Sequence, residues 1–222
     1  MPHLATGRLS RVLPALIVVA VLAVAAPTAA DPAGDTSATE TVRRHFESVL
    51  ALLKSRAFRE LSTEKRRAEL RRVSDRMFAW DEMARRSLGV AWKDRDAGER
   101  RSFTHGFVRL VERFYLGRLE DLDVSQVSDV PIRYLGEATA ARETVVETRL
   151  VHRRELPVNF RMVHRAKRWL VVDLEVDGIS VVDNYRAQFA RVVARDGYPA
   201  LVERVEDRAN ALRDDREGGA SP

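Results

Sequence analysis

The residue types that carry most catalysis and metal binding are sparse in this chain of 222 residues. It contains no cysteine, which excludes thiolate nucleophiles, disulfides and cysteine metal sites. The chain has no G-x-S-x-G elbow, no phosphate-binding glycine loop and no H-E-x-x-H motif. Its five histidines are isolated and lack the spacing of metal ligands; they are His3, His45, His105, His152 and His164. The sequence therefore predicts no catalytic residue, no metal site and no cofactor.

Three acids are the residues whose spacing still allows some chemistry. Asp173, Glu175 and Asp177 share one face of a strand-like segment, where they could bind a cation or form a solvated edge. The solvated edge is the favoured interpretation, although Asp173 could instead be a partly buried acid with a structural hydrogen-bond partner. An isomerase of the ketosteroid type would need a buried acid beside a donor, for which Tyr115 and Asp173 are the candidates. That enzyme is the alternative from a different functional class.

Composition and charge are those of an ordinary soluble globular protein, with 32% charged and 45% hydrophobic residues. A formal charge of +5, with basic residues spread along the chain, is too small to indicate nucleic-acid binding. The richest basic run is EKRRAELRRVSDRMF at 64–78. Because this run also contains acids and an apolar face, a solvated helix face is favoured over DNA or membrane binding.

The first 30 residues have the pattern of a targeting segment. Arg8 and Arg11 precede an apolar core at 13–26, and small residues suitable for cleavage follow. An uncleaved membrane anchor is the alternative, but the core has about 14 residues and a span needs about 20. We therefore expect a cleaved signal peptide at 1–30 and a mature protein that works outside the cytoplasm.

Helical spacing dominates the first half of the mature chain. Apolar residues recur at three- and four-residue intervals in 39–61 and again in 64–78. Asp81 is the predicted N-cap of a shorter helix that stops at Gly89. A capping box, Asp96 followed by Glu99, then begins a helix with a broad aromatic stripe, which could be solid core or could line a cavity.

Strand-like alternation follows in four segments, at 130–135, 144–151, 156–164 and 168–176. Their short connections predict an antiparallel meander. The last strand breaks at Asp177-Gly178, after which a helix is predicted from the spacing of Ile179, Val182, Tyr185 and Phe189. A final helix is predicted at 198–212.

This order of elements predicts an α+β fold with one domain at 39–213. We expect a twisted antiparallel sheet of about four strands, wrapped by N-terminal and C-terminal helices around an apolar pocket. Short disordered tails are expected at 31–38 and 214–222.

The pocket is predicted from periodicity alone. In the last strand, Leu170, Val172, Leu174 and Val176 occupy one face and Trp169 begins the other. Combining the inner sheet face with the aromatic helix gives the predicted lining residues, each of which could equally be solid core: Phe107, Val111, Phe114, Val146, Leu150, Val158, Phe160, Met162, Leu174 and Val176.

Three segments resemble the MlaC family, also called the toluene-tolerance family, of periplasmic phospholipid-binding proteins of Gram-negative bacteria. They are FAWDEMARRSLGVAW, DRDAGERRSFTHGFVRLVERFYLGRL and WLVVDLEVDGISVVDNYRAQF. The third resembles the family's most specific signature at Trp169, Asp173, Gly178, Ser180, Asn184, Tyr185, Arg186 and Phe189. Two positions depart from the pattern, since Val172 replaces a frequent aromatic residue and Asp177 replaces the more usual glutamate.

The resemblance implies a periplasmic carrier that performs no covalent chemistry. Such a carrier would shuttle phospholipid between an outer-membrane lipoprotein complex and an inner-membrane ABC transporter with an MCE-domain subunit, maintaining outer-membrane lipid asymmetry. A relative within the family that is associated with hopanoid production implies a hopanoid or sterol-type lipid as an alternative cargo. A protein-binding adaptor with a filled core is the remaining alternative.

Overall fold

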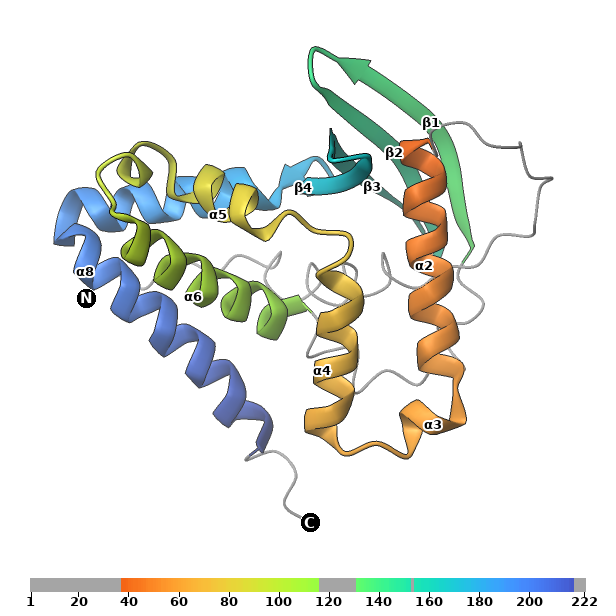
Figure 1. Cartoon of the computed structure of the whole chain (residues 1–222), viewed down its shortest axis with the longest axis horizontal. Coiled ribbons are helices and arrows are strands. Elements are labelled where there is room, and N and C mark those ends of the chain that lie inside the picture. The colour runs from red at the N-terminus through yellow and green to blue at the C-terminus, as the bar shows by residue number, and fades with distance from the viewer. Residues whose placement is uncertain (1–36, 116–130, 153, 218–222) are drawn as a thin grey trace.

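The computed structural model describes residues 37–115, 131–152 and 154–217 (Figure 1). The expected signal peptide at 1–30 lies outside these residues, as do most of the tail at 31–38 and the last residues of the tail at 214–222. The helical elements are α2 (Ala38–Lys54), α3 (Arg56–Arg59), α4 (Thr63–Ser74), α5 (Trp80–Leu88), the 3-10 turn η1 (Gly89–Trp92), α6 (Ala97–Tyr115) and α8 (Val181–Glu217). The strands are β1 (Ile132–Ala140), β2 (Glu143–His152), β3 (Arg154–Arg165), β4 (Arg168–Val176) and β5 (Ile179–Ser180).

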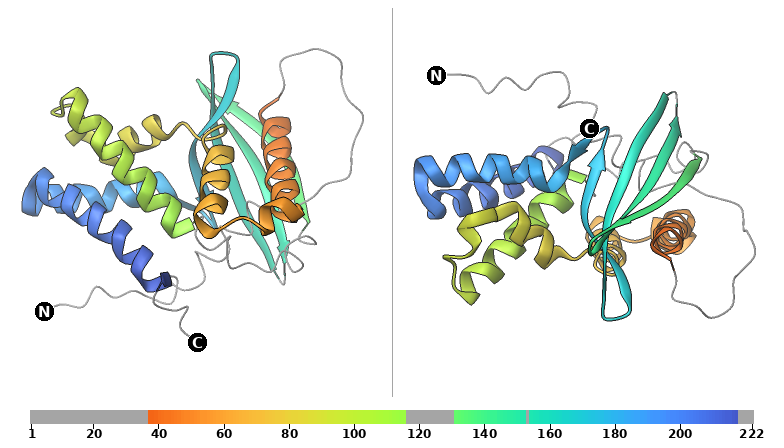
Figure 2. Two further views of the ribbon diagram at one scale, coloured as in Figure 1. Left: turned by 60° about the horizontal axis from the view of Figure 1, so that its bottom comes forward. Right: turned by 90° about the horizontal axis from the view of Figure 1, so that it is seen from above.

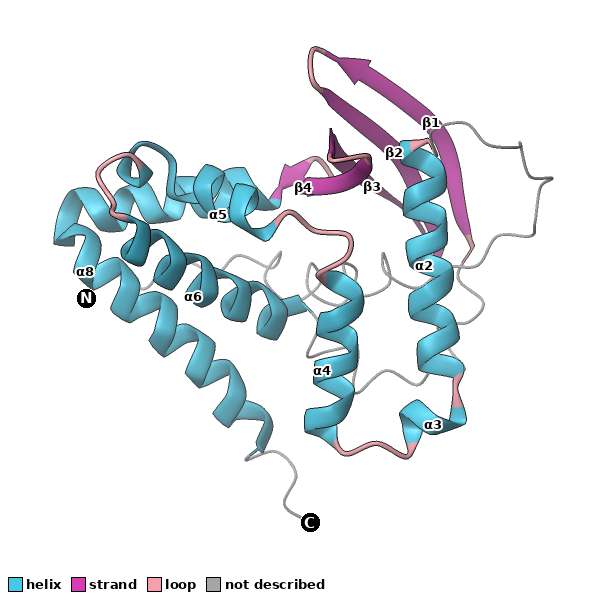
Figure 3. Ribbon diagram, in the orientation of Figure 1, coloured by secondary structure: helices cyan, strands magenta, loops and turns pink. Residues whose placement is uncertain are grey.

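The five strands form one antiparallel sheet in the order β1-β2-β3-β4-β5. The predicted α+β fold and antiparallel meander are therefore confirmed (Figure 3). Asp177 and Gly178 both adopt positive φ, 52° and 79°, in the turn that joins β4 to β5. Ile179 consequently belongs to β5 and is 37% exposed, so its predicted place on the buried helix face is wrong.

A bulge in β4 corrects the predicted inner face of that strand. Arg161 pairs with Asp173, but the next residue, Met162, pairs with Val171, which leaves Val172 as the extra residue. One extra residue moves everything before it to the opposite face. Trp169 and Val171 therefore pack on the inner face together with Leu174 and Val176. The prediction that Leu170 and Val172 share one face with Leu174 and Val176 is wrong.

The bulge lies where a distant segment joins the sheet. The amide of Val171 donates to the carbonyl of Met77 at 2.8 Å, and the amide of Ala79 donates to the carbonyl of Val171 at 2.9 Å. Phe78 thereby forms a parallel bridge with Val171. These bonds fix the chain between α4 and α5 against β4, so the helix predicted at 64–78 ends at Ser74.

Local capping signals explain most helix boundaries. Ser55 ends α2 and accepts a hydrogen bond from the amide of Phe58, which splits the single helix predicted at 39–61 into α2 and α3. The predicted capping box is confirmed, because Asp96 and Glu99 exchange side-chain-to-amide hydrogen bonds of 2.9 and 2.8 Å. Gly89 ends α5 with φ 62°, as predicted.

Two boundaries behave differently from these. Asp81 is not an N-cap, because α5 begins at Trp80 and its N-cap residue is Ala79, two residues before Asp81. α8 contains a non-helical residue, Gly197, with φ 84° and ψ 171°, so it consists of two helices that meet there. This agrees with the prediction of one helix after Gly178 and a separate helix at 198–212.

The sheet with α2 and the remaining long helices form two main regions (Figure 2), and each region has its own cluster of buried residues. We call the first the sheet half: the inner face of the sheet covered by α2, with a continuous apolar cluster between them. We call the second the helical half: α5, α6 and α8, which pack on one another beyond β4 around a cluster of their own. A smaller cluster joins α2 to α3 and α4.

Candidate functional site

Most predicted pocket residues lie together on the inner face of the sheet. Val146 of β2 pairs with Phe160 of β3, which in turn pairs with Leu174 of β4. Val158 pairs with Val176 in the same way. Apart from half-buried Leu174, these residues are no more than 3% exposed, as are the two remaining members of the set, Leu150 and Met162. The structure therefore brings the strand part of the predicted set into one apolar surface.

The predicted residues of the aromatic helix lie elsewhere. Phe107 and Val111 are buried in the helical half, where Phe107 contacts the rings of Tyr185 and Phe189 at 5.6 and 6.3 Å. The side chain of Phe114 lies outside the part of the structure that is described. The predicted set is thus divided between two clusters, and Leu174 is the member that contacts both.

α2 packs against the inner face of the sheet. The periodicity of the strands could not predict which helix would cover this face. Val42 and Phe46 pack on the sheet, and the Phe46 ring meets the Phe160 ring edge-on at 5.5 Å. The helical spacing of α2 showed that these residues were buried, but it could not show against which element. Ile132, Leu156 and Val171 also belong to this cluster.

Phe78 connects the two halves. Its side chain packs against both clusters, stacks on Trp80 at 4.8 Å, and meets the His45 ring edge-on at 6.5 Å. Burial lowers the pKa of His45 to about 4, so this imidazole is neutral at pH 7. An uncharged histidine can therefore lie at the apolar junction without a counter-ion.

Asp173 also lies at the junction, and it is 6% exposed. Its carboxylate accepts hydrogen bonds from the Ser180 hydroxyl at 2.6 Å and from the Val182 amide at 3.0 Å, at the start of α8. Burial raises its pKa, and the two hydrogen bonds oppose that rise. The favoured interpretation of a solvated edge is therefore wrong for Asp173, and the alternative of a buried acid with structural hydrogen-bond partners is confirmed. Tyr115, the suggested catalytic partner, has a side chain outside the described residues.

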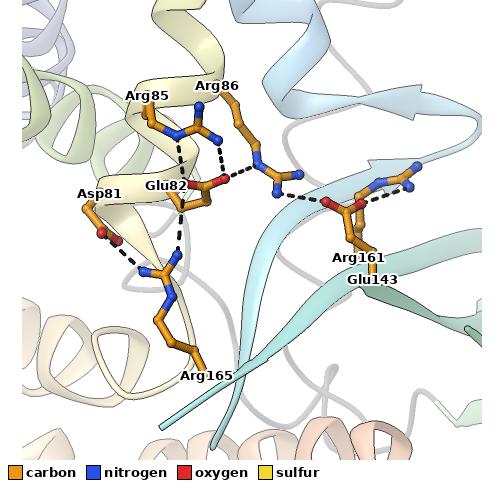
Figure 4. Close-up of polar contacts among 7 residues, drawn as sticks. All are labelled: Asp81, Glu82, Arg85, Arg86, Glu143, Arg161 and Arg165. Carbon is orange, nitrogen blue, oxygen red and sulfur yellow. Dashed lines mark hydrogen bonds and ion pairs between the residues drawn. The ribbon is translucent and has the colours of Figure 1, made fainter. Parts of the chain in front are cut away.

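A network of charged side chains spans from α5 to the sheet (Figure 4). Arg86 pairs with Glu82 on its own helix and with Glu143 of β2, both at 2.7 Å. Arg165 of β3 reaches Asp81 at 3.4 Å. Hydrogen bonds from the neighbouring arginines, Arg85 first, lower the pKa of Glu82 to about 2. This network is an electrostatic link between the two halves.

Metal binding and membrane spanning find no support in the described residues. Within 37–115, 131–152 and 154–217, no three histidine or acidic side chains gather as metal ligands would. No helix in these same ranges is both long and apolar enough to cross a bilayer.

Comparison with known proteins gives two findings. A family model described as "MlaC protein" matches residues 43–207. The fold resembles that of a phospholipid-binding protein from Ralstonia solanacearum, solved in complex with a phospholipid, with a TM-score of 0.68 and 21% identity over 80% of this chain and 99% of that one. A search of curated proteins found no match. Because the family model covers most of the sequence, this chain belongs to the MlaC family.

Proposed function

We propose that this protein binds a phospholipid and carries it between membranes. The observation that carries the proposal is the family match over residues 43–207. It is supported by the fold shared with 99% of a protein that was solved with a phospholipid bound.

The physical requirement for a carrier is large. Moving one methylene group from an apolar environment into water costs about 0.8 kcal/mol. Exposing an acyl chain of about sixteen carbons to water therefore costs roughly 12 kcal/mol. A lipid therefore crosses an aqueous compartment at a useful rate only inside a protein that shields its chains. The phosphate-bearing headgroup remains hydrated and needs no enclosed charged cage.

The sheet half is where we place the acyl chains. Its inner face is mainly apolar from β1 to β4, with Val146, Phe160 and Met162 near its centre. Phe107 and Val111 were predicted for the same pocket, but they pack among aromatic rings of the helical half. In this proposal Phe107 and Val111 do not contact the lipid and belong to the helical core that packs beside the site. Leu174 and Phe78 lie at the boundary between the two regions.

The wider role that we propose follows from the family. The exported protein would exchange phospholipid between an outer-membrane lipoprotein complex and an inner-membrane ABC transporter with an MCE-domain subunit. It would work in the periplasm after removal of residues 1–30, and it would maintain the lipid asymmetry of the outer membrane. Binding and release require no covalent step.

Native mass spectrometry of the exported, purified protein, followed by lipid extraction, tests this proposal. We expect about one phospholipid per protein molecule, which denaturation releases and added phospholipid restores. If the extracted lipid is a hopanoid or a sterol, the proposal that the protein carries a phospholipid is wrong. A lipid-free mass that does not change when phospholipid is added would favour a protein-binding adaptor.

A further inference from the structure

Two arginine–tyrosine pairs have the same geometry in different parts of the molecule. The Arg43 guanidinium of α2 lies 4.4 Å from the centre of the Tyr134 ring of β1. The Arg95 guanidinium likewise lies 4.4 Å from the centre of the Tyr198 ring in the helical half. The pairs differ in their hydroxyl groups. Tyr198 donates a hydrogen bond to the carbonyl of Glu99 at 3.3 Å, whereas the buried Tyr134 hydroxyl has no partner among the described residues.

The Tyr134 hydroxyl remains a hydrogen-bond donor under all physiological conditions. Burial raises its pKa, and the Glu47 and Glu40 carboxylates act in the same direction against the opposing effect of Arg43. Buried polar atoms in proteins nearly always have a partner, so a donor without one marks a place where an acceptor is expected. Arg43 also presents donors only.

This pair lies at the margin of the sheet half. Tyr134 is directly opposite Thr148 of β2 and packs against the inner-face cluster, and α2 runs beside β1 (Figures 1 and 2). Both Tyr134 and Arg43 are half-buried. Glu40 neutralises Arg43 only in part, at 3.3 Å and from a more exposed position. A buried hydroxyl donor and a half-buried guanidinium therefore lie side by side at the edge of the apolar cluster.

The same order of groups occurs along a phospholipid molecule. Its acyl chains end at ester carbonyl oxygens, and the phosphate follows, so the boundary of the apolar part presents only hydrogen-bond acceptors. Three other buried donors have no partner among the described residues: the Ser87 hydroxyl and the Nε atoms of Arg66 and Arg95. They do not fit this pattern, because Ser87 is completely enclosed in the helical half, Arg95 belongs to the pair of that half, and Arg66 lies on α4.

We propose that Tyr134 and Arg43 form the polar contact of the lipid site. The Tyr134 hydroxyl donates to an ester carbonyl oxygen of the bound phospholipid, and the Arg43 guanidinium faces its phosphate. This assignment rests on the proposed function and adds to it the residues that fix the depth of the lipid.

Tyr134→Phe tests the assignment, with Tyr198→Phe as the matched control. The delipidated protein is titrated with phosphatidylglycerol and bound lipid is measured by native mass spectrometry. Loss of one hydrogen bond should weaken binding to Tyr134→Phe about fivefold to tenfold. Its unfolding midpoint without lipid should be unchanged or higher, because the hydroxyl removed has no partner there. Tyr198→Phe should bind lipid as the wild type does.

A second lipid tests whether the ester carbonyl oxygen is the atom that accepts the hydrogen bond from Tyr134. A dialkyl ether analogue of phosphatidylglycerol keeps the phosphate but lacks the carbonyl oxygens, so Tyr134→Phe should bind it as well as the wild type does. Equal weakening with both lipids would overturn the ester assignment. Wild-type affinity in Tyr134→Phe would overturn the site while leaving the proposed function intact. If the wild type itself takes up no phosphatidylglycerol, both proposals are wrong.

Discussion

The helical half and the sheet half are both buried, but they are built from different side chains. In the helical half, the rings of Phe103, Phe107, Tyr185 and Phe189 contact one another at centroid distances of 5.4 to 6.3 Å. The inner face of the sheet is mainly aliphatic, and among the described residues Phe46 and Phe160 are the ring pair that meets across its cluster. The helical half is thus packed through contacts between aromatic rings, whereas the proposed lipid surface consists mainly of aliphatic side chains.

Close helix packing explains the first of these regions. Gly106 of α6 faces α8 so closely that a Cβ atom there would lie 3.2 Å from a methyl group of Val205. Interlocking aromatic rings then fill the space between α5, α6 and α8. The aromatic stripe of α6 therefore holds helices together, which is why a stripe of this kind does not by itself indicate a ligand site.

The largest effect is expected from opening a cavity in either half. Phe107→Ala and Phe160→Ala should each lower the free energy of unfolding by about 3–5 kcal/mol, measured by urea denaturation. The loss in Phe107→Ala should be the same with and without lipid. Phe160→Ala should in addition weaken phosphatidylglycerol uptake, because its ring lies on the proposed lipid surface.

Leucine replacements keep this comparison available if the alanine variants do not fold. Phe107→Leu and Phe160→Leu leave most of each side chain in place. Loss of lipid uptake in Phe107→Leu, with normal uptake in Phe160→Leu, would place the lipid in the helical half and contradict our assignment.

Asp173 should have the next largest effect, because it ties a strand of one half to a helix of the other. Asp173→Ala removes both hydrogen bonds to the start of α8 and should lower the free energy of unfolding by about 2–3 kcal/mol. Asp173→Asn retains an acceptor for the Val182 amide and should lose about half as much. Equal losses in the two variants would show that the Val182 contact contributes nothing.

Glu82 offers the smallest and most pH-dependent effect. Its pKa falls from 4.5 to about 2 in the folded protein, so its stabilisation is present above pH 4.5 and is lost as the pH falls toward 2. Because Arg85 is half exposed, we expect Glu82→Gln to cost only about 1 kcal/mol at pH 7. The free energy of unfolding, measured by urea denaturation from pH 7 to 2, should therefore fall less steeply with decreasing pH in Glu82→Gln than in the wild type.

Asp81→Asn is the control on the same helix. Its carboxylate is 71% exposed and meets Arg165 at 3.4 Å, so the change should alter the free energy of unfolding by less than about 0.5 kcal/mol. An effect of Asp81→Asn as large as that of Glu82→Gln would show that the link between the halves is spread over the whole network.

Sequence reasoning succeeded where structure depends on near neighbours. The capping box at Asp96 and Glu99, the helix stop at Gly89 and the turn at Asp177-Gly178 each rest on groups a few residues apart. The antiparallel order of the strands follows from their short connections for the same reason. Family membership was also evident from contiguous motifs, and the family model confirms it.

Tertiary contacts decided the rest. The bulge at Val172, which reverses the first part of β4, lies where Val171 pairs with Met77 and Ala79 from a remote part of the chain. The periodicity of a sequence indicates which face of an element is buried. Only the tertiary packing shows which other element covers that face. It was therefore packing that separated Phe107 from Phe160 and placed Arg43 over Tyr134.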